Sequence, residues 1–196
     1  MNYYYKVGAG ILALCCLAGC GGNREPEHTA LVRVLGVDGD EGGITLTAAA
    51  EKMPGESGAG GLFTGYGSDL GRARRALEES GERFPATTHT TQLLVGEGTE
   101  LYPLLRDCVE TRETGYRATV WLTEGSAEEL IRTEGCIGRL EILEGADGGA
   151  SCSVLDALAA LEEWGRVTLP VLGAEEGVLC REGDRVETRP GGQHGA

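Results

Sequence analysis

Cysteine and histidine are the residues of this chain best suited to nucleophilic or metal chemistry, and it has seven of the first and three of the second. His28 and His194 stand in polar stretches near the two ends, where little would preorganise them for catalysis. His89 has no second histidine or cysteine pair at the spacing of a metal site. It could form a nucleophile pair with Cys108, but Cys108 belongs to the apolar face of a predicted helix, where a thiolate is costly.

The sequence patterns of other enzymes and cofactor sites are also missing. There is no nucleophile elbow of the Gly-x-Ser-x-Gly type, no glycine-lysine phosphate loop and no dinucleotide fingerprint between a strand and a helix. The acidic residues are dispersed, so they do not suggest a paired-carboxylate site. The stretch DGDEGG, residues 38–43, lacks the later ligand positions of a calcium loop, which favours a plain turn. We therefore expect no enzyme activity, no cofactor and no metal.

Three further cysteines stand near the start of the chain, in LALCCLAGCGG, residues 12–22. One cation, Lys6, precedes an apolar stretch, Val7–Ala18, that is shorter than the roughly 20 residues of a membrane-spanning helix. A positive start, a short apolar centre and small residues at the end are typical of an export signal. The ending LAGC, residues 17–20, resembles the bacterial lipobox, whose cysteine is lipidated and becomes the first residue after cleavage.

Cys20 is therefore the predicted lipidation site, whereas Cys15 and Cys16 lack the motif and are expected to leave with the signal. The alternative is a plain secretory signal with a chance cysteine. Two or three acyl chains anchor a protein firmly, and no later apolar run is long enough to span a membrane. We expect a lipid-anchored protein on the extracytoplasmic face of the membrane. The predicted layout is a signal peptide at 1–19, a lipidated tether at 20–29, one folded domain at 30–188 and a flexible tail at 189–196.

Composition supports one folded domain and argues against one class of partner. A hydrophobic content of 41% is enough for a real core, and the remaining length suits a single domain. The net charge of −14 repels nucleic acid, which needs clustered lysine and arginine, so no nucleic-acid partner is expected. Four cysteines follow the anchor, and they allow three disulfide pairings. Their wide spacing beside apolar segments favours buried thiols over disulfides. These four are Cys108, Cys136, Cys152 and Cys180.

Hydrophobic periodicity predicts the elements that would position these residues. Strands are expected at 31–37, 44–50, 92–95, 116–125, 167–173 and 177–188, the last with a tight turn at 182–184. Helices are expected at 68–80, 99–115, 126–135 and 153–165. The glycine-rich segment 54–67 is predicted to be a flexible loop. The strand at 116–125 alternates, which predicts one core face and one wetter face. The order predicts an α+β fold, a mixed β-sheet with helices packed on it and hairpins at both ends.

Particular helices carry sharper predictions about their ends and faces. The helix at 99–115 is the clearest, with Thr99 as its cap, Gly115 as its stop and Leu105 in the middle of its apolar face. In the helix at 126–135, Ser126 and Glu129 form a capping-box pattern. The helix at 153–165 has an apolar stripe, which consists of Leu155, Leu158, Leu161 and Trp164.

The order of these segments resembles a known family. After the lipobox come the charged NREPEH, a strand ending LGVD, a turn and TLTA, a helix with RALEES, and His89 leading into a strand that ends VG. A helix with LLRD, a strand, GSAEELI and LPVLG then follow. The order is similar to that of the N-terminal domain of the Ger(x)C family, the lipoprotein C subunit of spore germinant receptors. The resemblance covers roughly Asn23 to Val186, and family members usually carry a second region of comparable length.

The resemblance implies a function through protein contacts. Such proteins sit on the outer face of the spore's inner membrane and join multi-pass membrane subunits in a receptor that senses nutrients and starts germination. It implies no enzyme activity and no cofactor. Two alternatives stay open: a stand-alone lipid-anchored module that binds a ligand or peptide, and a thiol-dependent enzyme.

Overall fold

The computed structural model describes residues 28–52, 61–146 and 151–190. The strands are β1 (Thr29–Asp40), β2 (Gly43–Ala50), β3 (Leu62–Gly67), β4 (Phe84–Ala86), β5 (Gln92–Val95), β6 (Thr119–Thr123), β7 (Arg166–Glu175) and β8 (Val178–Thr188). The helices are α2 (Leu70–Glu79), α3 (Leu101–Thr111), α4 (Ala127–Ile131), α5 (Cys136–Ala146) and α6 (Val154–Trp164), with a 3₁₀ turn, η2, at Thr87–His89.

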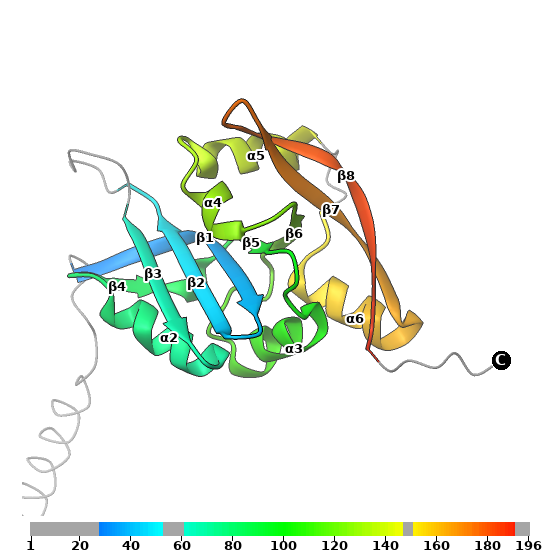
Figure 1. Cartoon of the computed structure of the whole chain (residues 1–196), viewed down its shortest axis with the longest axis horizontal. Helices are drawn as coiled ribbons and strands as arrows, with labels where there is room; N and C mark the ends of the chain where they lie inside the picture. Colours follow the sequence, from blue (N-terminus) through cyan, green and yellow to red (C-terminus); the bar gives the residue numbers. More distant parts are fainter. Residues whose placement is uncertain (1–27, 53–60, 147–150, 191–196) are drawn as a thin grey trace, which may run out of the picture.

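All eight strands of the described residues belong to one mixed sheet, with the order β3-β2-β1-β5-β6-β7-β8, and β4 pairs with the start of β1 (Figure 1). Strands β1, β5, β6 and β7 are parallel, whereas β2, β3 and β8 pair with their neighbours in the antiparallel sense. The β1–β2 and β7–β8 pairs are the hairpins expected at the two ends of the fold. The predicted α+β class is therefore confirmed.

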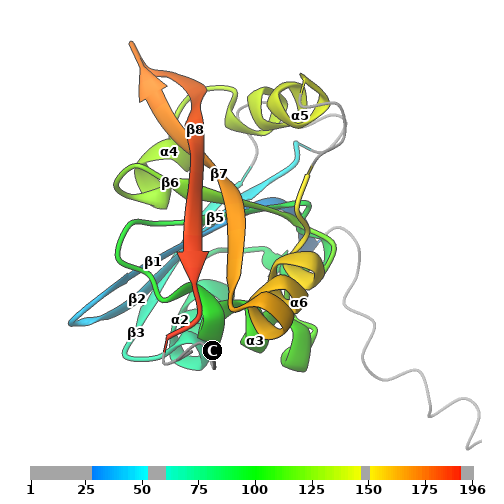
Figure 2. The same ribbon diagram turned by 90° about the vertical axis from the view of Figure 1, so that its right-hand side faces the viewer.

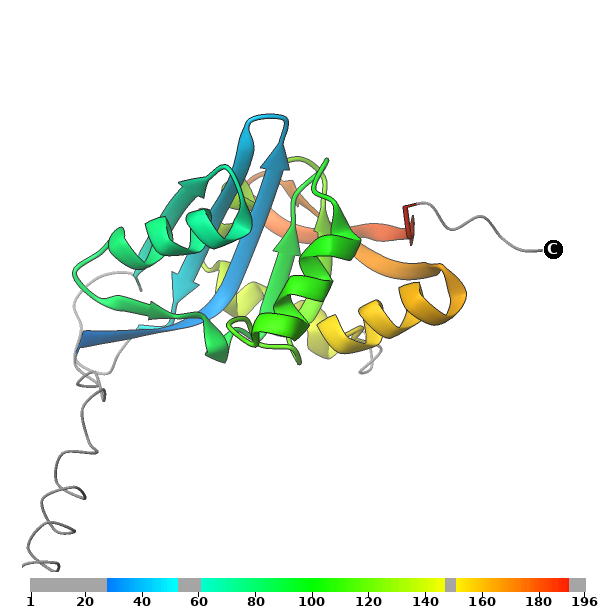
Figure 3. The same cartoon turned by 90° about the horizontal axis from the view of Figure 1, so that it is seen from below.

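Helices cover both faces of the sheet. Helices α2, α3 and α6 lie in a row on one face (Figure 3), and Figure 2 shows α4 and α5 on the opposite side. Each face has its own hydrophobic core. The larger core includes Leu77, Leu105 and Leu161, and the smaller one is built around Trp121, Leu140 and Leu172. Burial on both sides explains how a sheet of this size is stabilised without a second sheet.

Strand β3 corrects the prediction of a loop over 54–67, of which residues 54–60 lie outside the described part. Leu62–Gly67 pairs in register with β2. Its glycines do not mark a turn. Instead, they let helix α2 lie directly on the strand backbone. A Cβ atom on Gly65 would lie 2.1 Å from the backbone nitrogen of Leu77, and one on Gly67 would lie 2.3 Å from that of Ala73. Close helix–strand contact therefore requires glycine at both positions.

Strand β6 is buried on both faces, so the prediction that one of its faces is wetter is wrong. Ala118, Val120 and Leu122 point into the larger core, as the alternation predicts. On the opposite face, however, Thr119, Trp121 and Thr123 are also buried. Helices α4 and α5 cover this second face, and the local pattern of one strand contains no information about them.

Helix α3 has the predicted buried face, with Leu101, Leu104, Leu105 and Cys108 inside. Its predicted ends are wrong. Glu100 is the N-cap, without a side-chain hydrogen bond, and the helix ends at Thr111 because Arg112 takes a left-handed conformation with φ of 58°. The hydroxyl of Thr99, the predicted cap, instead pairs with strand β1.

Helices α5 and α6 differ from the predictions in different ways. Helix α5 is absent from the predicted elements, because its apolar residues do not follow one stripe and Ile142 is exposed. Helix α6 has the predicted position, but two members of its expected apolar stripe, Leu155 and Trp164, face outward. Its buried side consists of Val154, Ala157, Leu158 and Leu161.

The β7–β8 hairpin turns at Glu176 and Gly177, which both have positive φ, and not at the predicted Glu182–Asp184. Strand β8 continues through Gly183, where the pairing register with β7 shifts. Arg189, which the sequence places in the tail, donates its backbone N–H to Gly165 and stacks on Tyr102 at 4.5 Å from the ring centroid. Residues 191–196 lie outside the described part.

Candidate functional site

A groove of about 950 Å³ opens where strands β1 and β5 end. Its walls are the β1–β2 hairpin tip, the start of α2 and the loop from β5 into α3. These parts contribute Val37, residues 39–44, 68–70 and 97–100, and Pro103, Leu104 and Asp107. In sheets with parallel strands, ligands bind beyond the carboxyl ends of the strands. The groove therefore lies at the edge of the sheet where ligands are expected.

The hairpin tip is held by its own hydrogen bonds. The Asp40 carboxylate accepts from the backbone N–H groups of Gly42 and Gly43, at 2.6 and 2.9 Å. The Tyr66 hydroxyl donates to the Gly42 carbonyl at 2.8 Å. This is the plain turn predicted for DGDEGG. Across the residues that the structure describes, no three histidine, cysteine, aspartate or glutamate side chains come together as metal ligands.

Thr99 attaches the other wall of the groove, the β5–α3 loop, to strand β1. Its hydroxyl accepts from the backbone N–H of Gly39 at 2.8 Å and lies 3.2 Å from the Val37 carbonyl, to which it donates. The β5–α3 loop is thereby pinned to the end of β1 on both sides of Asp38. The groove walls are thus held together by hydrogen bonds from one hydroxyl to the backbone of a strand about 60 residues earlier in the chain.

Six carboxylates and no lysine or arginine line the groove, namely Asp40, Glu41, Asp69, Glu97, Glu100 and Asp107. Asp69 caps α2 and pairs with Arg72 at 3.4 Å. The hydrogen bond from the Arg72 backbone N–H lowers the pKa of Asp69 below its usual value, and the nearby arginine charge adds to this effect. The groove is therefore strongly negative at neutral pH.

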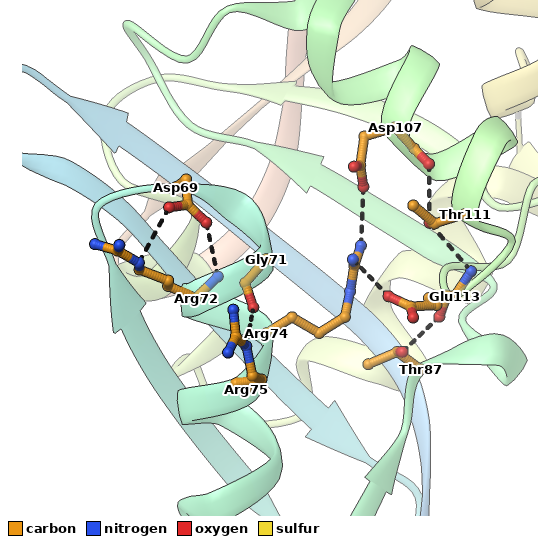
Figure 4. Close-up of polar contacts among 9 residues, drawn as sticks. All are labelled: Asp69, Gly71, Arg72, Arg74, Arg75, Thr87, Asp107, Thr111 and Glu113. Carbon is orange, nitrogen blue, oxygen red and sulfur yellow. Dashed lines mark hydrogen bonds and ion pairs between the residues drawn. The ribbon is translucent and has the colours of Figure 1, made fainter.

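Arg74 forms ion pairs with Asp107 and Glu113 (Figure 4). Its guanidinium lies 3.0 Å from Asp107 and 2.6 Å from Glu113, and the residue is only 8% exposed. The Glu113 carbonyl in turn accepts from the Thr87 hydroxyl at 2.5 Å. This network ties α2 to the end of α3. The sequence gives little sign of it because GRARR resembles an exposed basic face, although Arg74 directly follows the core residue Ala73.

Asp38, at the end of the LGVD strand, joins β1 to helix α4. Its carboxylate accepts from the N–H groups of Ala127 and Glu128 at 2.7 and 2.9 Å, and from the Ser126 hydroxyl at 3.1 Å. Ser126 accepts from the Glu129 N–H at 3.4 Å, which is the side-chain half of the predicted capping box. The sequence signal of this contact is an aspartate directly after the strand predicted at 31–37, although β1 itself continues to Asp40.

A second polar cluster lies between the sheet and α5. The Trp121 indole N–H donates to the Gln92 side-chain oxygen at 2.6 Å, and the Gln92 amide donates to Glu144 at 2.7 Å. Thr119 donates to the other Glu144 oxygen. These bonds satisfy the polar groups of Gln92, Thr119 and Trp121, which are buried under α5, so the cluster contributes to the packing of that helix.

The structure does not prepare the candidate nucleophile Cys108 for reaction. Burial raises the pKa of its thiol to about 11, and Thr114 is its hydrogen-bond neighbour. His89 lies in the exposed part of η2. Burial likewise raises the pKa of Cys136 to about 11. All four later cysteines are free thiols, as expected, but only Cys108 and Cys136 are fully buried.

The predicted lipidation site, Cys20, lies outside the described residues, as do Cys15 and Cys16. Within the described residues, none of the helices has the length and apolar character needed to cross a bilayer. The anchor prediction thus rests on the sequence motif alone.

Comparison with known proteins gives one match. The sequence model of a family described as "Spore germination protein N-terminal domain" matches residues 22–137, which is more than half of the chain. The match runs from just after Cys20 through β1, the groove and α4 into the start of α5, so the resemblance noted for the remainder of the chain lies beyond it. No curated protein and no solved structure matches the chain. The chain belongs to this family of spore germination proteins, and its matched part is their N-terminal domain.

Proposed function

We propose that this chain is a lipid-anchored component of a spore germinant receptor, which acts in nutrient-triggered germination through contacts with multi-pass membrane subunits. Family membership over residues 22–137 carries the proposal. The lipobox ending at Cys20 supports anchoring, with residues 1–19 as signal peptide, 20–29 as tether, 30–188 as the folded domain and 189–196 as tail. The anchor would hold the domain on the outer face of the spore's inner membrane.

A contact role fits the chemistry of the described residues better than catalysis does. The two buried thiols, Cys108 and Cys136, have pKa values of about 11, so they stay protonated and unreactive at neutral pH. An anchor confines a protein to two dimensions beside its partners, which raises the effective concentration of both. Weak contacts are then enough to hold a complex together.

Deletion of the gene tests this proposal. We expect slower germination with nutrients, while sporulation and a germinant-independent trigger stay normal. The variant Cys20→Ala should remain uncleaved and unlipidated and should mimic the deletion, because a freed domain loses its proximity to the membrane subunits. Incorporation of labelled fatty acid measures lipidation, and wild-type incorporation by the variant would refute the anchor.

Related proteins in the same spore could hide the loss. The deletion is therefore repeated in a strain that lacks every paralogous gene. If nutrient responses are still unchanged in that background, the receptor role is wrong.

The carboxylate-lined groove beyond β1 and β5 favours a second candidate function, a stand-alone lipid-anchored module that captures a ligand or peptide. The two candidates differ in their partners. A receptor component co-purifies with a multi-pass subunit from spore membranes, whereas a stand-alone module binds its ligand without one.

A further inference from the structure

The groove beyond β1 and β5 contains charge that the described protein does not neutralise. Arg72 pairs with Asp69, and Arg74 pairs with Asp107. The exposed side chains of Glu41, Glu97 and Glu100 have no basic partner among the described residues, and no lysine or arginine lines the groove. The Asp40 carboxylate accepts only backbone N–H groups, so four of the six groove carboxylates lack a basic partner within the described part of the chain.

The floor between these carboxylates is apolar. Val37 and Leu104 are buried beneath it, and Ile44, Leu70 and Pro103 complete it. Glu41 stands on the hairpin side, whereas Glu97 and Glu100 stand on the loop side. The hydrogen bonds of Asp40, Tyr66 and Thr99 hold both sides in place.

This arrangement matches one kind of occupant. Lysine and arginine side chains have an apolar stem and a cationic head, so the stem can lie on the floor while the head meets carboxylates. A bare metal ion fits less well, because the described carboxylates do not converge on one point. An anion or a nucleic acid would be repelled.

We propose that this groove, which we call the acidic groove, is the docking site for a lysine- or arginine-bearing segment of a partner protein, with apolar residues flanking the basic one. The proposal rests on the proposed function, because it gives the chemistry of the contact through which the receptor component would act. Complementary charge steers such encounters and fixes their specificity.

The first test uses the full chain in detergent micelles and two labelled peptides, Leu-Lys-Val-Lys-Leu and Leu-Glu-Val-Glu-Leu. Fluorescence anisotropy should detect binding of the lysine peptide only, and the binding should weaken with added salt. The double variant Glu97→Gln/Glu100→Gln should weaken binding on the order of tenfold. The matched control Glu78→Gln/Glu79→Gln removes the same charge from exposed positions on the last turn of α2 and should bind as the wild type does.

The second test is co-purification of membrane subunits with the same variants from spore membranes. We expect a loss of recovered partner with Glu97→Gln/Glu100→Gln and full recovery with the control. If both variants bind peptide equally and recover equal amounts of partner, the docking proposal is overturned while the receptor function stands. If the wild type recovers no membrane subunit, the receptor function fails, and the peptide result still decides what the acidic groove binds.

Discussion

Gly65 allows helix α2 to pack directly on the backbone of strand β3. Its Cα lies so close to helix α2 that a Cβ atom would sit 2.1 Å from the Leu77 nitrogen and 2.4 Å from the Ala73 oxygen. Both contacts are with backbone, which cannot rotate away. The variant Gly65→Ala must push α2 off strand β3, and we expect a loss of about 3 kcal/mol in the free energy of unfolding, measured by urea denaturation.

Gly138→Ala is the control for that measurement. Gly138 lies within α5, and a Cβ atom added there would meet no atom within 4 Å other than those of its chain neighbours and of the backbone of its own helix. Alanine should therefore be neutral or stabilise by about 0.5–1 kcal/mol. An equal effect of the two substitutions would show that backbone entropy, and not close contact, explains the glycine of β3.

At the scale of elements, helix α3 is the part that the sequence describes best. Leu105 is fully buried in the middle of its apolar face. Leu105→Ala should therefore lower the free energy of unfolding by about 2–5 kcal/mol, because it removes buried methyl groups and leaves a cavity. Leu155→Ala in α6 is the matched comparison, since Leu155 is 48% exposed and its loss should cost less than about 1 kcal/mol. Similar losses for both leucines would contradict the assigned faces.

What the sequence could predict follows from how local each signal is. The stripe of α3, the core face of β6 and the turn at DGDEGG depend on neighbouring residues, and the structure confirms all three. The strand character of LFTGYG depends on a helix that packs on it, and the second buried face of β6 depends on α4 and α5. Single-sequence patterns do not contain such distant partners.

The candidate site shows the same limit at the scale of the whole molecule. Its acidic walls come from three segments, around Glu41, Asp69 and Glu97, that only the fold brings together. In the sequence these carboxylates are dispersed and resemble ordinary surface charge. The overall charge of −14 predicts what the protein repels, but only the topology shows where the repulsion is concentrated.

The central position of β1 has a mechanical consequence. Strand β1 pairs with β2 on one side and with β4 and β5 on the other, whereas β8 pairs with β7 alone among the described strands. A pull on the segment before Thr29 loads β1 along its length and shears two rows of hydrogen bonds at once. A pull at the end of β8 loads one row. In an optical trap, the protein is held at one shared internal site and pulled from either end. We expect a higher unfolding force when it is pulled from the amino-terminal end than from the carboxyl-terminal end, and equal forces would contradict this. The proposed lipid anchor thus attaches at the end of the chain that resists tension best.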